Sequence, residues 1–78
     1  MVKVKFFGIM KAYMPETEED GFWHADRDGV TVGQLMDETG ASEKDVAVTI
    51  LVNKVRKTKE YVLQDGDTLT VMPLVAGG

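Results

Sequence analysis

The sequence predicts an α+β fold in which one mixed sheet of four to five strands packs on one main helix. Three observations predict it: apolar and polar residues alternate near both ends of the chain, a helix-capping pattern stands at 31–34, and a β-branched run covers 46–52. For a chain of 78 residues, the economical arrangement of such elements is one sheet with one helix across a face. We therefore expect a single domain over 1–78.

The first strand is expected at residues 2–6. Its valines and phenylalanine fall on one face and its two lysines on the other, which is the period of a half-buried strand. Phe7 breaks this alternation and places an aromatic ring on the outer face. Residues 8–14 predict a loop or a single helical turn, and the strand composition of 22–27 predicts an antiparallel neighbour of the first strand.

The main helix is expected at residues 31–39. Thr31 and Gln34 fit a capping box, in which each side chain bonds the other residue's backbone amide. Gly40 fits the stop signal after the last turn. Residues 42–45 could cap a further short turn.

The second half of the chain returns to strand periodicity. Residues 46–52 alternate, Asn53-Lys54 predicts a turn, and 55–57 predicts a short returning strand. The last strand is expected at 68–72, after an Asp-Gly-Asp turn. Because the first and last strands are both apolar enough to be central, parallel pairing of these two would give a ubiquitin-like β-grasp.

Composition excludes several classes of function. The chain has no cysteine, which removes disulfides, thiolate catalysis and cysteine-based zinc or iron–sulfur sites. Its single histidine, His24, rules out a histidine-rich metal site, so we expect no bound metal. A core this small argues against a complete enzyme. The 9 basic and 13 acidic residues give a net charge of −4, which disfavours nucleic acid as a partner.

The sequence shows no pattern for membrane insertion or export. No apolar run approaches the roughly 20 residues that span a bilayer. The lysine-containing start lacks the apolar core of a signal peptide. We therefore expect a cytoplasmic protein without a membrane partner.

Four polar features have a structural interpretation that outweighs a catalytic one. His24 is expected on a strand surface or in packing, the acidic residues 16–20 in a solvated loop, and the Asp-Gly-Asp of 65–67 in a turn rather than a calcium loop. The basic cluster within 54–59 either blocks strand-to-strand aggregation at a sheet edge, which we favour, or binds phosphate.

Several segments match a known pattern. They are Val4-Lys5-Phe6-Phe7-Gly8, Ile50-Leu51-Val52-Asn53, Leu63-Gln64-Asp65-Gly66-Asp67-Thr68-Leu69, Pro73, Val75 and the final Gly77-Gly78. On these residues the chain resembles the ThiS/MoaD sulfur carriers, that is, the thiamin sulfur-carrier protein and the small subunit of molybdopterin synthase. The resemblance covers the chain except the loop near 14–29, and it implies the ubiquitin-like β-grasp fold.

The resemblance also implies a site of covalent attachment at Gly78, at the end of a flexible tail, 75–78, that includes Ala76 and Gly77. An adenylating, E1-like activating enzyme would use ATP to form an acyl-adenylate there. A sulfur donor protein would convert it into a thiocarboxylate, and a synthase large subunit or an equivalent acceptor would take the sulfur. The chain itself would bind no cofactor and contain no catalytic residue.

The chemistry of such a tail follows from elementary principles. A carboxylate is a poor electrophile, and adenylation gives it a good leaving group that a sulfur nucleophile can displace. Two glycines suit an end that must pass through a narrow channel, because no Cβ can clash there. Four extended residues reach about 13 Å, far enough to enter a partner's active site.

Apolar residues near the last strand predict a docking patch. Phe7, Met72, Leu74 and Val75 stand outside the expected buried faces or beyond Pro73. In the molybdopterin-synthase small subunit, the aromatic after the first strand and the residues before the double glycine face the partner, which carries over to Phe7, Met72, Pro73 and Val75. Two residues depart from that pattern, since Met72 stands in place of an aromatic and Leu74 in place of a second proline.

The resemblance leaves the pathway open. The chain length and the Met-Pro-Leu-Val segment favour the molybdopterin or tungstopterin branch, that is, molybdenum-type cofactor biosynthesis, while the Val-Ala-Gly-Gly end also suits a thiamin sulfur carrier. Two other classes stay open: a ubiquitin-like modifier conjugated through Gly78 to a lysine, and a β-grasp interaction domain with an inert tail.

Overall fold

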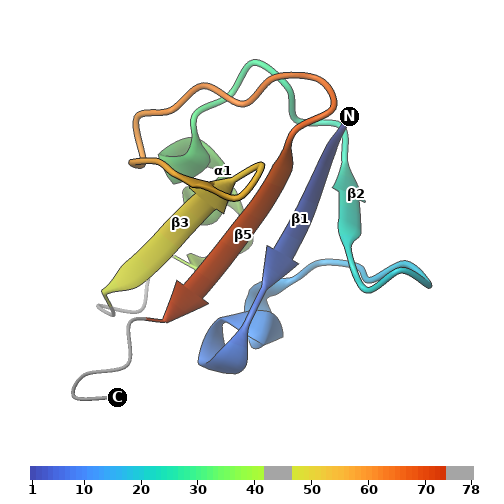
Figure 1. Ribbon diagram of the computed structural model, residues 1–78. Coiled ribbons are helices and arrows are strands. Elements are labelled where there is room, and N and C mark those ends of the chain that lie inside the picture. The colour runs from blue at the N-terminus through green and yellow to red at the C-terminus, as the bar shows by residue number, and fades with distance from the viewer. Residues whose placement is uncertain (42–46, 74–78) are drawn as a thin grey trace.

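The computed structural model describes residues 1–41 and 47–73, and these form a mixed sheet of five strands with α1 across one face (Figure 1). In chain order the elements are β1 (Val2–Phe6), the 3₁₀-helix η1 (Gly8–Tyr13), β2 (Trp23–Ala25), α1 (Val32–Thr39), β3 (Val48–Val52), β4 (Val55–Arg56) and β5 (Thr68–Pro73).

The first and last strands lie side by side at the centre of the sheet. The strand order is β2-β1-β5-β3-β4, and β1 runs parallel to β5 while every other pair is antiparallel. In the central pair, Val4 is opposite Leu69 and Phe6 is opposite Val71. This arrangement confirms the predicted β-grasp, including the antiparallel pairing of β2 with β1.

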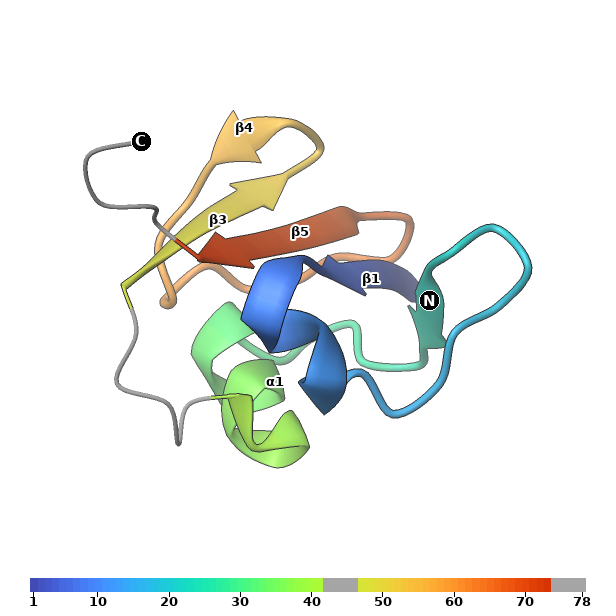
Figure 2. The same cartoon turned by 90° about the horizontal axis from the view of Figure 1, so that it is seen from below.

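The core lies between α1 and one face of the sheet (Figure 2). Strict alternation in the central strands supplies the sheet side of this core. Its buried apolar residues are Val2, Val4, Phe6, Met10, Trp23, Ala25, Val32, Leu35, Met36, Ala41, Ile50, Val52, Leu63, Leu69 and Val71. The opposite face of the sheet carries the alternate side chains, and these are more accessible to solvent.

The predicted caps of α1 are both present. The backbone amide of Gln34 donates to the Thr31 hydroxyl at 3.1 Å, and the backbone amide of Thr31 donates to Oε1 of the Gln34 side chain at 2.8 Å. Gly40 ends the helix with a φ of 85°, a left-handed conformation that favours glycine. The Arg27 guanidinium donates hydrogen bonds to the Glu38 carboxylate at distances as short as 2.6 Å, which connects the loop after β2 to the helix.

Several element boundaries differ from the expectation, and among them β3 leaves out Ala47 and β4 leaves out Lys57. Residues 8–14 contain the six-residue helix η1 rather than a loop or a single turn, because Met10 enters the core and is 1% exposed. Strand β2 has three residues instead of the six of 22–27. Strand β5 continues through Pro73, which is opposite Val48. Val46 and the expected turn at 42–45 lie outside the described residues.

A buried carboxylate anchors the start of β5. Asp67 is 7% exposed and accepts hydrogen bonds from the Asn53 amide at 2.8 Å, the Tyr61 hydroxyl at 3.0 Å and the Gln64 backbone amide at 2.8 Å. Burial alone would raise the pKa of Asp67, but these hydrogen bonds outweigh it and lower the pKa below the ordinary value. The motif residues Asn53 and Asp67 therefore have a structural role.

Candidate functional site

The position of the tail is set by the central strand of the sheet. β5 is paired with β1 from Thr68 to Val71 and with β3 from Leu69 to Pro73. The Phe7 amide adds a hydrogen bond to the Val71 carbonyl at 2.9 Å. The chain beyond Pro73 thus follows a central strand whose last two residues pair with β3 alone.

The predicted site residues of the tail lie outside the described part of the chain. These are the docking residues Leu74 and Val75, the tail residues Ala76 and Gly77, and the attachment site Gly78. Their roles stay predictions. Of the predicted docking residues, Phe7, Met72 and Pro73 are described.

A close backbone approach joins the end of β5 to the start of η1. Gly8 has a φ of +59°, and a Cβ built on it would lie 3.0 Å from Cγ of Pro73. That distance is shorter than an ordinary van der Waals contact, so a side chain at Gly8 would push against the proline ring. Gly8 therefore allows Pro73 to pack against the chain that follows β1.

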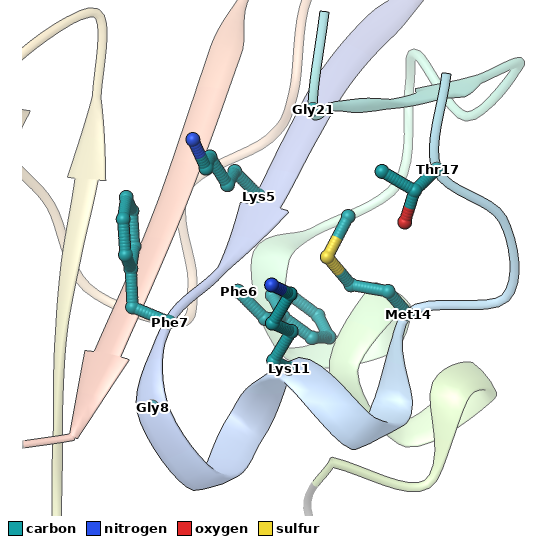
Figure 3. Close-up of a pocket in the computed structure, with 8 residues that line it drawn as sticks. All are labelled: Lys5, Phe6, Phe7, Gly8, Lys11, Met14, Thr17 and Gly21. Carbon is teal, nitrogen blue, oxygen red and sulfur yellow. The ribbon is translucent and has the colours of Figure 1, made fainter. Parts of the chain in front are cut away.

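Phe7 and Met72 lie on the side of the sheet that faces away from α1. Phe6 is opposite Val71 and both are buried, so the next residue of each chain falls on the other face. Phe7 is 38% exposed, and Figure 3 shows its ring pointing away from that of Phe6. Met72 is partly buried. This placement suits a docking surface, but the docking role itself stays a prediction.

The open face of the sheet combines apolar and cationic side chains. A row across the strands joins Lys5, Thr70, Leu51 and Arg56, which are opposite one another in the strand register. The neighbouring row pairs Thr49 with Met72. Sequence reasoning did not single out Leu51 or Thr70, although the alternation of β3 and β5 marks both as outward-facing.

An aromatic ring, rather than a carboxylate, holds the Lys5 ammonium on this face. Lys5 Nζ lies 5.4 Å from the centre of the Phe22 ring and 5.0 Å from that of Phe7. Lys3 Nζ is 6.0 Å from the Phe22 ring and 3.8 Å from an oxygen of Asp20. Although the chain has a net charge of −4, this face therefore presents cations to a partner.

The other polar residues that the sequence singled out include His24 and the basic cluster within 54–59. His24 Nε2 lies 2.8 Å from Oδ2 of Asp20, and the backbone amide of Phe22 donates to the same carboxylate at 3.0 Å. The Phe22 amide and then His24 lower the pKa of Asp20. The lysines and arginine of 54–59 surround the short edge strand β4, whose Val55 is 55% exposed, as expected for residues that protect a sheet edge.

Within residues 1–41 and 47–73, no group of three or more His, Asp or Glu side chains is arranged to hold a metal ion. Over the same residues, no helix is both long and apolar enough to cross a bilayer.

Two solved structures from Haloferax volcanii are similar to this chain. SAMP1 shares 22% sequence identity with a TM-score of 0.67, and the alignment covers 99% of this chain and 98% of SAMP1. The HVO 2177 protein shares 25% identity with a TM-score of 0.65, covering 99% of this chain and 85% of the other. At these identities the likeness supports the β-grasp fold.

A search of curated proteins gives no significant match. The ThiS family matches residues 4–78, which include the second half of β1, all of β5 and the Gly77-Gly78 end. This match covers nearly the whole chain, and the parallel central strands and the capped helix agree with it. The chain therefore belongs to the ThiS family of ubiquitin-like sulfur carriers.

Proposed function

We propose that this protein is a sulfur carrier that is adenylated and then thiocarboxylated at Gly78, and that it donates the sulfur in molybdopterin-type cofactor biosynthesis. The observation that carries the proposal is the family match, which continues through Gly78. The described fold supports it, because the chain leaves the sheet from a central strand paired on both sides.

The activation proceeds in two stages. The Gly78 carboxylate attacks the α-phosphorus of ATP and pyrophosphate leaves, which gives an acyl-adenylate. A persulfide of the donor protein then attacks the carbonyl carbon and AMP leaves. A second donor thiol attacks the acyl disulfide, which releases the thiocarboxylate and leaves a disulfide on the donor. ATP, the thiols and the catalytic bases all belong to partners in this scheme.

The described residues of the carrier supply recognition. Phe7, Met72 and Pro73 stand where β1 and β5 end, so a partner that contacts them lies beside the start of the tail. The cations of the open face guide association with an acidic partner surface. An E1-like activating enzyme and a synthase large subunit would use this surface in turn, with Leu74 and Val75 extending the contact.

Mass analysis of the intact protein from its own cells tests the chemistry. An oxygen-to-sulfur exchange at Gly78 is expected, and a chain lacking Gly77 and Gly78 should show none. Lysine-linked adducts without the exchange would identify a modifier instead. If neither form accumulates when the activating enzyme and the sulfur donor are present, the carrier function is wrong.

A second measurement tests the branch. The thiocarboxylated protein should support dithiolene formation by a molybdopterin-synthase large subunit and fail to support thiazole formation in a thiamin pathway. The opposite result would retain the carrier chemistry and overturn the molybdopterin assignment. The unmodified protein is the control in both reactions.

A further inference from the structure

A pocket opens beside Phe7, between the end of β1, η1 and the loop that leads to β2 (Figure 3). It encloses about 350 Å³. Its lining residues are Lys5, Phe6, Phe7, Gly8, Lys11, Met14, Thr17 and Gly21. The sequence resemblance did not predict it, because several of its lining residues belong to the loop near 14–29 that the resemblance leaves out.

The interior of the pocket is apolar. Phe6 belongs to the core, and Met14 packs partly against that core. Figure 3 shows the Met14 thioether reaching into the space between Phe6 and Thr17. Methionine adapts its shape to different apolar partners, so this lining suits a large apolar side chain inserted from outside.

The charged groups that line the pocket are both cations. Lys5 comes from β1 and Lys11 from η1. Within residues 1–41 and 47–73, neither ammonium group forms an ion pair. Lys5 is instead held between the Phe7 and Phe22 rings, 5.0 and 5.4 Å from their centres. A cation in this position keeps its capacity to bind a carboxylate.

The carboxylates of the acidic loop beside the pocket do not line it. The exposed loop residues Glu16, Glu18 and Glu19 are not among the lining residues. Asp20 is engaged by His24 at 2.8 Å and by Lys3 at 3.8 Å. The pocket therefore combines an apolar interior with a positive rim in a protein whose net charge is −4.

We propose that this pocket receives one large apolar side chain, next to a carboxylate, from a partner protein that docks on the carrier. The positive rim favours a partner segment that carries a carboxylate. Among segments that carry one, the apolar interior favours those with a large apolar side chain next to it. The pocket shares Gly8 with the Pro73 contact, so an inserted side chain would lie close to the chain that enters the tail. The existence of a protein partner rests on the proposed function, while the preference of the pocket is tested separately.

Amide NMR spectra of the full-length protein, titrated with three blocked tripeptides, test the proposal. Acetyl-Asp-Leu-Asp-amide should shift the amides of Gly8, Lys11, Thr17 and Gly21 saturably. Acetyl-Asp-Ala-Asp-amide, which lacks the large apolar group, and acetyl-Asn-Leu-Asn-amide, which lacks the charges, should each bind several-fold more weakly. Added salt should weaken the Asp-Leu-Asp complex more than the Asn-Leu-Asn complex.

Three variants locate the binding. Lys11→Gln should weaken the binding of the Asp-Leu-Asp peptide several-fold and leave the binding of the Asn-Leu-Asn peptide nearly unchanged. Lys59 is an exposed lysine away from the pocket, so Lys59→Gln should change the affinity for neither peptide. Thr17→Trp places a ring at the mouth and should abolish binding of both, with thermal unfolding showing that the fold is retained. Equal affinity for the three peptides, shifts centred elsewhere, or no saturable shift would overturn the proposal. Thiocarboxylate formation at Gly78 is measured independently, so either idea can fail alone.

Discussion

Replacing Gly8 with alanine should destabilise the fold and disturb the end of β5. The backbone there has a φ of +59°, and the new Cβ would stand 3.0 Å from Cγ of Pro73. The ring cannot rotate away as a flexible side chain would, and Pro73 is held opposite Val48 in the sheet. The methyl group must therefore displace the strand end or the start of η1.

The expected loss has two parts. A left-handed backbone costs a non-glycine residue about 1–2 kcal/mol. Overpacking by one methyl group adds about 1–3 kcal/mol. Together they give a decrease of roughly 2–5 kcal/mol in the free energy of unfolding, which is a large share of the stability of so small a domain.

Urea unfolding of four proteins separates the two parts: the parent, Gly8→Ala, Pro73→Ala and the double variant. Pro73→Ala removes the ring that the new methyl group would contact. In that background, the loss of unfolding free energy caused by Gly8→Ala should be smaller than in the parent by at least about 1 kcal/mol. Gly29→Ala is a matched control, because Gly29 has a φ of +90° and nothing within 4 Å of a built Cβ. The reasoning is refuted if Gly8→Ala costs the same with and without the proline ring.

Three further outcomes are expected. The pKa of Asp67 in the folded protein is below its ordinary value of 3.8. The ionised carboxylate therefore stabilises the folded state fully above pH 3.8, and this stabilisation is lost as the pH falls through the lowered pKa. Asp67→Asn should remove that part of the acid sensitivity in urea midpoints taken across the acidic range, and an unchanged pH profile would contradict it. Val71→Ala should lower stability by about 1–3 kcal/mol, because Val71 is fully buried, whereas Thr70→Ala on the open face should change it little. Phe7→Ala should weaken binding to the activating enzyme by about 2 kcal/mol while lowering stability much less, and early unfolding with normal binding would assign Phe7 to the core.

Local patterns were sufficient to predict most of the fold. The alternation of 2–6 and of 68–72 marked two strands with one buried face, and the pairing of the Thr31 and Gln34 side chains at the helix start depends on residues only three apart. The turn at Asn53-Lys54 was also predicted from adjacent residues, and Asn53 and Lys54 adopt positive φ values of 52° and 70°. These features depend on neighbours in the sequence.

Other features depend on residues that meet only in the folded chain. η1 forms because Met10 finds a place in the core, and 8–14 alone has no periodicity long enough to show it. Asp67 was predicted only as part of a turn, since its partner Asn53 is fourteen residues earlier and reaches it through the sheet. The Lys5 ammonium meets Phe22 because β2 pairs with β1. The candidate pocket arises from the same kind of tertiary contact.

The pairing of β5 on both sides has a mechanical consequence. Under the proposed function, a partner would pull on the chain at Pro73, and a pull along the axis of β5 would load the hydrogen bonds of that strand. In that direction the hydrogen bonds to parallel β1 and to antiparallel β3 bear the load together, in shear. By contrast, a force perpendicular to an edge strand would break its backbone hydrogen bonds one after another. Under the proposed function, this pairing would keep the domain folded while a partner holds the chain beyond β5.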